Sequence, residues 1–324
     1  MINIKPKIKL VFLPYLIISL VTLIGWTFLH WLLFIKCNIY EVNESFITVI
    51  IPAALPLISI LIWLNKKINL LRIKSKNLVW YILVPSVAMG GLNLFGSQYI
   101  ILATSPTTNL SSINKIEKKE PTKFYKLKNF YLDKKHFSIK KQYNGSGRNG
   151  QNLEMHLYIT IPILNSIKDT VDSNCKGWYG IKYTKTAYDF GYNHEINPLK
   201  DKIDINKNTY DIDFDDSTNK IENSNEFKRF INESMMKFDT LNINQFLYLD
   251  RISKITSDYN NYILAIKKNT KYNTNSDVVL LPFNEPLIDR ANDNLKVALI
   301  IFGIGSLLFL IMLIVPNLKS EDEL

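Results

Sequence analysis

The stretch Leu78-Val-Trp-Tyr-Ile-Leu-Val-Pro-Ser-Val-Ala-Met-Gly-Gly-Leu-Asn-Leu-Phe-Gly-Ser-Gln-Tyr-Ile-Ile-Leu-Ala103 decides the fold class, because it is apolar and contains no Lys, Arg, Asp or Glu. A helix of about 20 residues crosses a hydrocarbon core of roughly 30 Å. A charge at the centre of that core costs about 2.5–3.5 kcal/mol. Three further stretches, residues 10–35, 46–64 and 297–315, are equally free of charge. The sequence therefore predicts four transmembrane helices.

A buried core helix and a cleaved signal peptide are the alternatives to these spans. Core helices are usually amphipathic, whereas the four stretches are apolar all round. The first stretch follows Lys5, Lys7 and Lys9, as a signal peptide would, but it continues past Trp31 without a small-residue cleavage site. We therefore expect it to remain as an anchor.

Basic residues in the short flanks predict the orientation, because Lys and Arg favour the cytoplasmic side of a membrane. The flank before the first span is basic, and the loop of residues 65–77 holds five basic residues and no acidic one. We expect both termini in the cytoplasm and residues 104–290 outside. The frequent Asn, Lys and Ile are typical of an AT-rich bacterium, so the predicted location is the inner membrane, with residues 104–290 periplasmic or extracellular.

Residues 104–290 are numerous enough to form a domain with its own core. Aromatic and branched residues predict strands, and the polar loop Asn144-Gly-Ser-Gly-Arg-Asn-Gly150 predicts a hairpin between two of them. The strands are expected at residues 123–132, 137–143, 153–164, 177–186, 246–251, 262–267 and 278–283.

One amphipathic helix is predicted at residues 225–239, with Asn223 and Glu226 at its capping positions. Its Phe and Met side chains share one face, which we expect to pack on the sheet of the same domain. The fold class is thus a membrane protein with four transmembrane α-helices and an α+β extracytoplasmic domain between helices 3 and 4. Residues 1–103 and 291–324 form the membrane region.

The net charge of +10 raises nucleic acid as a partner, but the charge is not spread over one surface. Part of it lies in the cytoplasmic flanks, and residues 115–148 hold 11 basic residues against Glu117, Glu120 and Asp133. We therefore expect no nucleic acid. A basic strip just outside the third span can contact lipid phosphates or an acidic partner, or it can be a solvated face.

The two cysteines, Cys37 and Cys175, are both expected outside the membrane. They can form one disulfide or remain as two unpaired thiols, and two cysteines do not make a disulfide framework. Metal binding through cysteine is not indicated, because the sequence has no CxxC motif.

A calcium-loop spacing occurs at Asp211-Ile-Asp213-Phe-Asp215-Asp-Ser217-Thr-Asn-Lys-Ile-Glu222. Oxygen ligands at positions 1, 3, 5, 7 and 9, with a glutamate at position 12, can surround Ca²⁺, and a predicted helix follows the loop. Asp216 stands where such loops need glycine, and no helix is evident before the loop. The alternative is an edge strand whose aspartates point to solvent. Calcium is the single cofactor that the sequence suggests.

Catalytic arrangements are weak in this sequence. Asn144-Gly-Ser-Gly147 lacks the first glycine of a nucleophile turn, and His30 and Ser97 are separate polar residues within two different spans. The small and polar residues of the third span, from Gly90 to Gln98, predict close helix packing rather than an ion path.

Several segments together resemble a known family. They are Lys7-Ile-Lys-Leu-Val-Phe-Leu-Pro-Tyr15, Phe28-Leu-His-Trp-Leu-Leu-Phe-Ile-Lys36, residues 51–63, 123–135 and 153–164, Trp178-Tyr-Gly-Ile-Lys-Tyr183 and Phe246-Leu-Tyr-Leu-Asp-Arg-Ile252. In these the chain resembles the N-terminal membrane and extracytoplasmic region of Bacteroidetes-type rhomboid intramembrane serine proteases. The protease core with its catalytic serine and histidine is missing from this chain. The resemblance therefore implies an accessory or sensing region and transfers no catalytic residue.

Two function classes follow from the sequence. The favoured one is a non-catalytic integral membrane protein whose extracytoplasmic domain binds a membrane or envelope protein partner or a ligand, in an accessory, sensor or immunity-type role. The alternative is an enzyme or transporter component with an unrecognised site, such as a remnant of a rhomboid-type protease system. The few polar residues within the spans do not favour transport.

Overall fold

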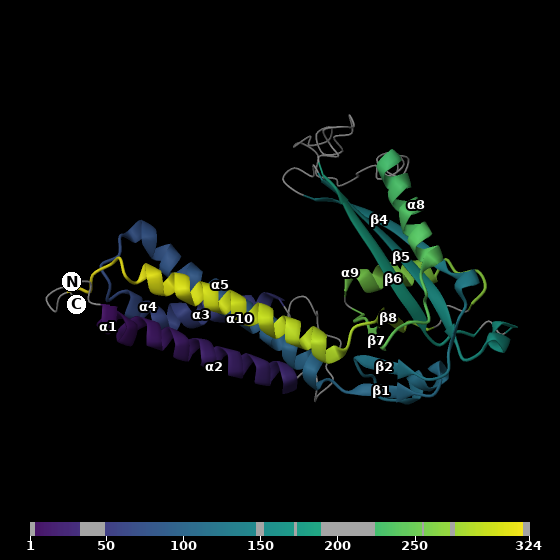
Figure 1. The fold of residues 1–324 in the computed structure, drawn as a ribbon, viewed down its shortest axis with the longest axis horizontal. Helices are drawn as coiled ribbons and strands as arrows, with labels where there is room; N and C mark the ends of the chain where they lie inside the picture. Colours follow the sequence, from purple (N-terminus) through teal and green to yellow (C-terminus); the bar gives the residue numbers. More distant parts are fainter. Residues whose placement is uncertain are drawn as a thin grey trace, which may run out of the picture.

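The computed structural model describes residues 4–32, 49–146, 152–171, 174–188, 224–254, 256–272 and 276–319. These residues form a long helix bundle and a mixed α/β region at one end of it (Figure 1). The strands follow the third long helix in the chain and precede the fourth.

Four helices in the described residues are long and apolar enough to cross a membrane, as predicted. The first covers Ile4–His30 and comprises α1 (Ile4–Lys7), a π-helical segment and α2 (Leu13–His30). The second covers Ile51–Ile68 and comprises α3 (Ile51–Ser59), a π-helical segment and α4 (Asn65–Ile68). The third and fourth are α5 (Ser75–Thr104) and α10 (Leu287–Met312). The first and last begin earlier than the predicted residues 10 and 297, because helical backbone continues into their polar flanks.

The small residues of α5 lie where other helices approach it. A Cβ atom added at Gly91 would lie 2.5 Å from Ile301 Cγ2 of α10, and one added at Gly96 would lie 3.0 Å from Leu23 Cδ1 of α2. One added at Gly90 would lie 3.6 Å from the Ala53 Cα atom of α3. Helix α5 therefore packs against three other helices, and the predicted packing role of its small residues is confirmed.

The start of α1, the described residues after α10 and the basic loop after α4 lie together at the end of the bundle opposite the sheet (Figure 1). The buried Lys7 Nζ donates a hydrogen bond to the Ile314 carbonyl at 3.0 Å, just past the C-terminus of α10. The Arg72 amide donates to Asn317 at 2.8 Å. A lysine at this position stabilises the negative end of the α10 dipole.

The α/β region contains an eight-stranded mixed sheet in the order β1-β2-β7-β8-β6-β5-β3, with β4 paired to β5. Strands β1 and β2 are parallel, as are β6 and β8, and the other pairs are antiparallel. The strands are β1 (Thr107–Leu110), β2 (Phe124–Leu127), β3 (Tyr131–Leu132), β4 (Ser138–Ser146), β5 (Asn152–Leu164), β6 (Trp178–Ala187), β7 (Tyr248–Arg251) and β8 (Val279–Phe283).

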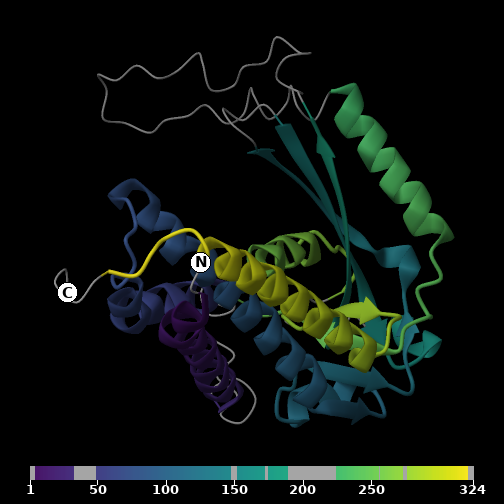
Figure 2. The same cartoon turned by 60° about the vertical axis from the view of Figure 1, so that its left-hand side comes forward.

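Helices α8 (Asn225–Thr240) and α9 (Ser257–Ile266) cover opposite faces of this sheet. Phe227, Phe230 and Phe238 of α8 pack in one cluster with Leu157 and alternate residues of β5. Tyr259, Tyr262 and Ile266 of α9 pack in another with Tyr158. Figures 1 and 2 show that α8 lies on the face turned away from the bundle, and α9 on the face turned toward it.

Three sequence predictions for this region need correction. The strand predicted at residues 262–267 is wrong, because these residues end α9 and continue past it; the buried Tyr259, Tyr262 and Ile266 have helical spacing. The segment 123–132 divides into β2 and β3. Helix α8 is confirmed, but its N-cap is Ser224 and not Asn223, since the Ser224 hydroxyl accepts the Phe227 amide hydrogen.

Candidate functional site

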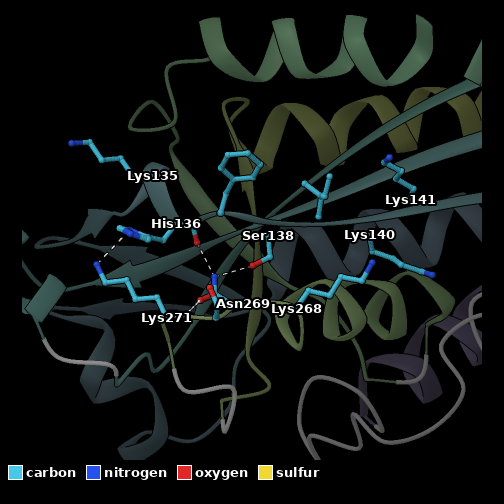
Figure 3. A pocket seen from close by; sticks show the side chains of 11 residues that line it. Lys135, His136, Ser138, Lys140, Lys141, Lys268, Asn269 and Lys271 are labelled. Carbon is cyan, nitrogen blue, oxygen red and sulfur yellow. Dashed lines mark hydrogen bonds between the residues drawn. The ribbon is translucent and has the colours of Figure 1, made fainter. Parts of the chain in front are cut away.

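A lysine-lined pocket lies where the C-terminal end of α9 meets strand β4 (Figure 3). Its volume is about 590 Å³, and its walls are residues 135–141 and 268–271. Among the described residues, β4 pairs only with β5, so the pocket lies at an edge of the sheet. Its basic side chains are Lys135, His136, Lys140, Lys141, Lys268 and Lys271.

Asn269 joins the two walls of the pocket. Its side-chain nitrogen donates hydrogen bonds to the His136 carbonyl and to Ser138 Oγ, both at 2.8 Å. Its side-chain oxygen accepts from the Lys271 amide at 3.0 Å and from the Tyr272 amide at 2.9 Å. This amide fixes the turn after α9 against the start of β4, because it uses both its donor and its acceptor atoms.

Asp133 is a buried carboxylate beside the pocket, and it is only 2% exposed. It accepts hydrogen bonds from the Tyr272 hydroxyl and from His136 Nδ1, the latter at 2.7 Å, and Lys271 Nζ lies 3.6 Å away. Burial alone would raise the pKa of Asp133, but these hydrogen bonds and the charges of His136 and Lys271 outweigh it and lower the pKa. Asp133 therefore stays ionised and is already bonded within the wall.

The other four lysines of the pocket keep their charge uncompensated by the described residues. Lys135, Lys140, Lys141 and Lys268 form no ion pair within the part of the chain that the structure describes, whereas Lys271 approaches Asp133. Like charges gathered at one site repel each other, and an anion bound between them relieves that repulsion. The electrostatics of the pocket thus favour a negatively charged ligand.

Lysine side chains suit an oxyanion ligand. Each ammonium group carries three donors and a compact charge, and it can bond to the oxygens of a phosphate or a carboxylate. Ser138, the hydroxyl residue of the pocket wall, is buried, and its Oγ accepts the bond from Asn269. The arrangement supports binding and provides no activated nucleophile at Ser138.

A second polar group attaches the start of α9 to the sheet. The Tyr158 hydroxyl donates a hydrogen bond to Asp258 Oδ1 at 2.7 Å, and Lys182 Nζ donates to the same carboxylate at 2.8 and 3.0 Å. His156 lies two residues before Tyr158 on β5 and is buried, and its Nδ1 atom is 3.1 Å from Thr184 Oγ1. These residues orient α9 and therefore the turn that forms one wall of the pocket.

The predicted calcium ligands Asp211, Asp213, Asp215, Ser217 and Glu222 lie outside the described residues, so calcium stays a prediction. The residues that the structure describes contain no group of three or more His, Cys, Asp or Glu side chains that could hold a metal ion.

The cysteine and serine predictions have different outcomes. Cys175 is a free, buried thiol that donates a hydrogen bond to the Gly177 carbonyl at 3.0 Å, and burial raises its pKa to about 11. Cys37 lies outside the described residues. Ser97 donates to the Leu94 carbonyl at 2.9 Å, within its own helix.

The sequence indicates one wall of the pocket and misses the other. Residues 135–141 fall in the basic strip predicted at residues 115–148. The sequence does not connect residues 268–271 with this strip, because it predicts a strand at residues 262–267. The helical spacing of Tyr259, Tyr262 and Ile266, after the capping residue Thr256, is the signal that would have placed α9.

Comparison of the chain with protein-family models, with curated proteins and with solved structures finds no match. The resemblance to rhomboid-type proteins is therefore neither supported nor opposed by these comparisons. The functional argument rests on the pocket and on the helix bundle.

Proposed function

We propose that this chain is a non-catalytic integral membrane protein whose α/β domain binds an anionic ligand or an acidic partner in the lysine-lined pocket. The observation that carries the proposal is that Lys135, Lys140, Lys141 and Lys268 line one pocket and form no ion pair among the described residues. The bonded Asn269 supports a formed site, because it fixes both walls before a ligand arrives.

The four long apolar helices support insertion into a membrane. The basic flanks lie together at the end of the bundle opposite the sheet, which favours cytoplasmic termini and an extracytoplasmic domain between helices 3 and 4 (Figure 1). The bacterial inner membrane is the location we propose. The resemblance to the region preceding rhomboid proteases favours an accessory or sensing role beside another membrane protein.

Calorimetric titration of the full-length protein in a neutral detergent tests anion binding. The two probes are inorganic pyrophosphate and a hexaglutamate peptide, because they distinguish a phosphate ligand from a carboxylate partner. We expect saturable binding of one of them at low salt. Replacing both Lys140 and Lys268 by alanine should weaken it about tenfold or more, since each lost charge contact costs up to about 1 kcal/mol.

The matched control replaces Lys66 and Lys67, two exposed lysines of α4 at the opposite end of the bundle, by alanine. This variant removes the same charge and should bind the probes as the wild type does. The proposal is wrong if neither probe binds, or if the two double variants weaken binding equally.

A further inference from the structure

Strand β4 is a long edge of the sheet. It covers nine residues, Ser138–Ser146, and among the described residues its one strand partner is β5. No backbone–backbone hydrogen bond joins β4 to a described residue outside that pair. In an antiparallel edge strand, alternate residues direct their N–H and C=O groups away from the neighbouring strand. About half of the β4 backbone groups therefore have no backbone partner in the part of the chain that the structure describes.

The opposite edge of the sheet is short and partly covered. Strand β1 has four residues, and Lys119 Nζ donates a hydrogen bond to the Asn109 carbonyl at 3.1 Å. Within the described ranges, the one side chain that bonds to the β4 backbone is Thr160 of β5, at the Ser138 carbonyl. An edge that is long and uncovered is the kind of edge that pairs with another chain.

Lys140 and Lys141 lie on opposite faces of the β4 edge, because successive residues of a strand alternate. Ile139 and Tyr143 pack in the cluster that contains α8, so Lys141, which lies between them, is on the α8 face. Lys140 is on the other face, where it lines the pocket together with Lys268 (Figure 3). Both lysines belong to the pocket wall, so the edge of β4 runs along the pocket.

The charges of this edge select an acidic strand. A strand added beside β4 places consecutive side chains on opposite faces, so two consecutive carboxylates lie beside Lys140 and Lys141. Opposite charges on neighbouring strands stabilise a sheet, and like charges destabilise it. Two copies of β4 would bring their own lysines together, so pairing between two copies of this chain is disfavoured.

We infer that β4 binds an extended acidic segment of a partner protein as an added strand of the sheet, with two consecutive carboxylates on Lys140 and Lys141. The inference rests on the proposed function, because it names the partner class that the lysine-lined pocket takes. Backbone hydrogen bonds along β4 supply the affinity for an extended chain, and the lysines supply the preference for acidic sequences.

Calorimetric titration with N-methylated peptides tests strand addition on the full-length protein in a neutral detergent. The probe is the acetylated peptide amide Thr-Val-Thr-Glu-Glu-Thr-Val-Thr. One copy carries N-methyl groups on its odd-numbered residues, and another carries them on its even-numbered residues. A strand bonds to its neighbour through alternate residues, so one pattern removes the N–H donors that face β4 and the other leaves them in place.

We expect the unmodified peptide and one methylated copy to bind alike, and the other copy to bind about tenfold more weakly or worse, because it loses several hydrogen bonds. Replacing both glutamates of the peptide by glutamine should weaken binding, and so should the double variant Lys140→Gln, Lys141→Gln. The matched control, in which Lys66 and Lys67 of α4 are replaced by glutamine, should bind the peptide as the wild type does.

Hydrogen–deuterium exchange locates the bound peptide. The uptake of deuterium should fall in residues 138–146 of β4, because their outward amides become bonded. It should stay unchanged in residues 107–110 of β1, the opposite edge.

Equal affinities of the two methylated copies, or unchanged exchange in β4, would overturn the inference. If the binding of pyrophosphate or hexaglutamate still depends on Lys140 and Lys268, the proposed function stands, and the pocket takes an anion without strand pairing. If no probe binds, both the inference and the proposed function are wrong.

Discussion

Lys134 and Lys135 are adjacent in the chain and have different roles. Lys134 Nζ donates hydrogen bonds to the carbonyls of Phe238 and Asp239 at 2.6 and 2.9 Å, and it lies 4.7 Å from the centre of the Phe238 ring. It therefore caps the C-terminal end of α8, where a positive charge is favourable. Lys135 lines the pocket instead, and its side chain extends outward from the pocket wall (Figure 3). Of these two charges, only that of Lys135 is available to a ligand.

His156 makes the stability of the α/β region depend on pH. Burial lowers the pKa of His156, the charge of Lys182 lowers it further, and Glu154 and Asp258 act in the opposite direction. Below the ordinary histidine pKa of 6.5, the unfolded chain binds a proton that the folded chain does not. The stability contributed by neutral His156 is therefore present above about pH 6.5 and is lost as the pH falls through that value.

The His156→Gln variant removes this titration while keeping a polar side chain of similar size. Melting temperatures of the wild type and the variant, measured in detergent between about pH 8 and pH 5, should show a smaller decrease in the variant as the pH falls. Parallel curves for the two proteins would mean that His156 does not contribute to the pH dependence.

At the scale of elements, α8 and the hairpin of β4 and β5 were predictable because their signals are local. The stripe of Phe and Met residues predicts α8, and the glycine-rich loop near residue 147 predicts the hairpin. Each pattern lies within one short stretch of the sequence. Strand β1 is not predictable from its sequence, because Thr107–Leu110 is short and polar and pairs in parallel with β2. The run Tyr262–Ile266 is apolar and short, and such runs do not distinguish a strand from a buried helix.

The pocket could be predicted only in part, since its two walls are more than a hundred residues apart in the chain. The lysines of residues 135–141 are visible as a charged strip. Their position beside Lys268 and Lys271 depends on the packing of α9 against β4 and β5 and on the bonds of Asn269. No periodic pattern in the sequence encodes such a non-local contact.

The contact between α5 and α10 depends on Gly305. A Cβ atom added there would collide with the Ala88 side chain and lie 3.3 Å from the Ala88 Cα atom, whereas one added at Gly303 meets nothing within 4 Å. Gly305→Ala should lower the stability by about 1–3 kcal/mol through overpacking. Gly303→Ala should be neutral or slightly stabilising, because alanine favours helices.

Thermal unfolding of both variants in the same detergent checks this prediction. The pair is matched, since both glycines lie in α10 and both changes add one methyl group. Equal melting temperatures for the two variants would show that α5 and α10 do not pack as closely as the structure indicates.

At the scale of the whole molecule, the joint between bundle and sheet connects the domain that carries the proposed binding site to the four long apolar helices. Arg290, in the first turn of α10, donates a hydrogen bond to the Tyr248 hydroxyl at 2.6 Å, and its guanidinium lies 3.8 Å from the centre of the Phe283 ring. Strands β7 and β8 are thus attached to α10 by side chains as well as by the chain. A ligand held on the sheet is mechanically linked to α10.

The central claim is that four helices cross a membrane and carry the lysine-lined pocket on its outer side. The most direct test labels single cysteines with a membrane-impermeant maleimide in bacterial spheroplasts, in a Cys37→Ser background. Lys141→Cys lies at the exposed edge of the pocket, and Lys74→Cys lies at the opposite end of the bundle. We expect Lys141→Cys to react in intact spheroplasts and Lys74→Cys to react only after lysis. Reaction of Lys74→Cys from outside, with Lys141→Cys protected, would contradict the account.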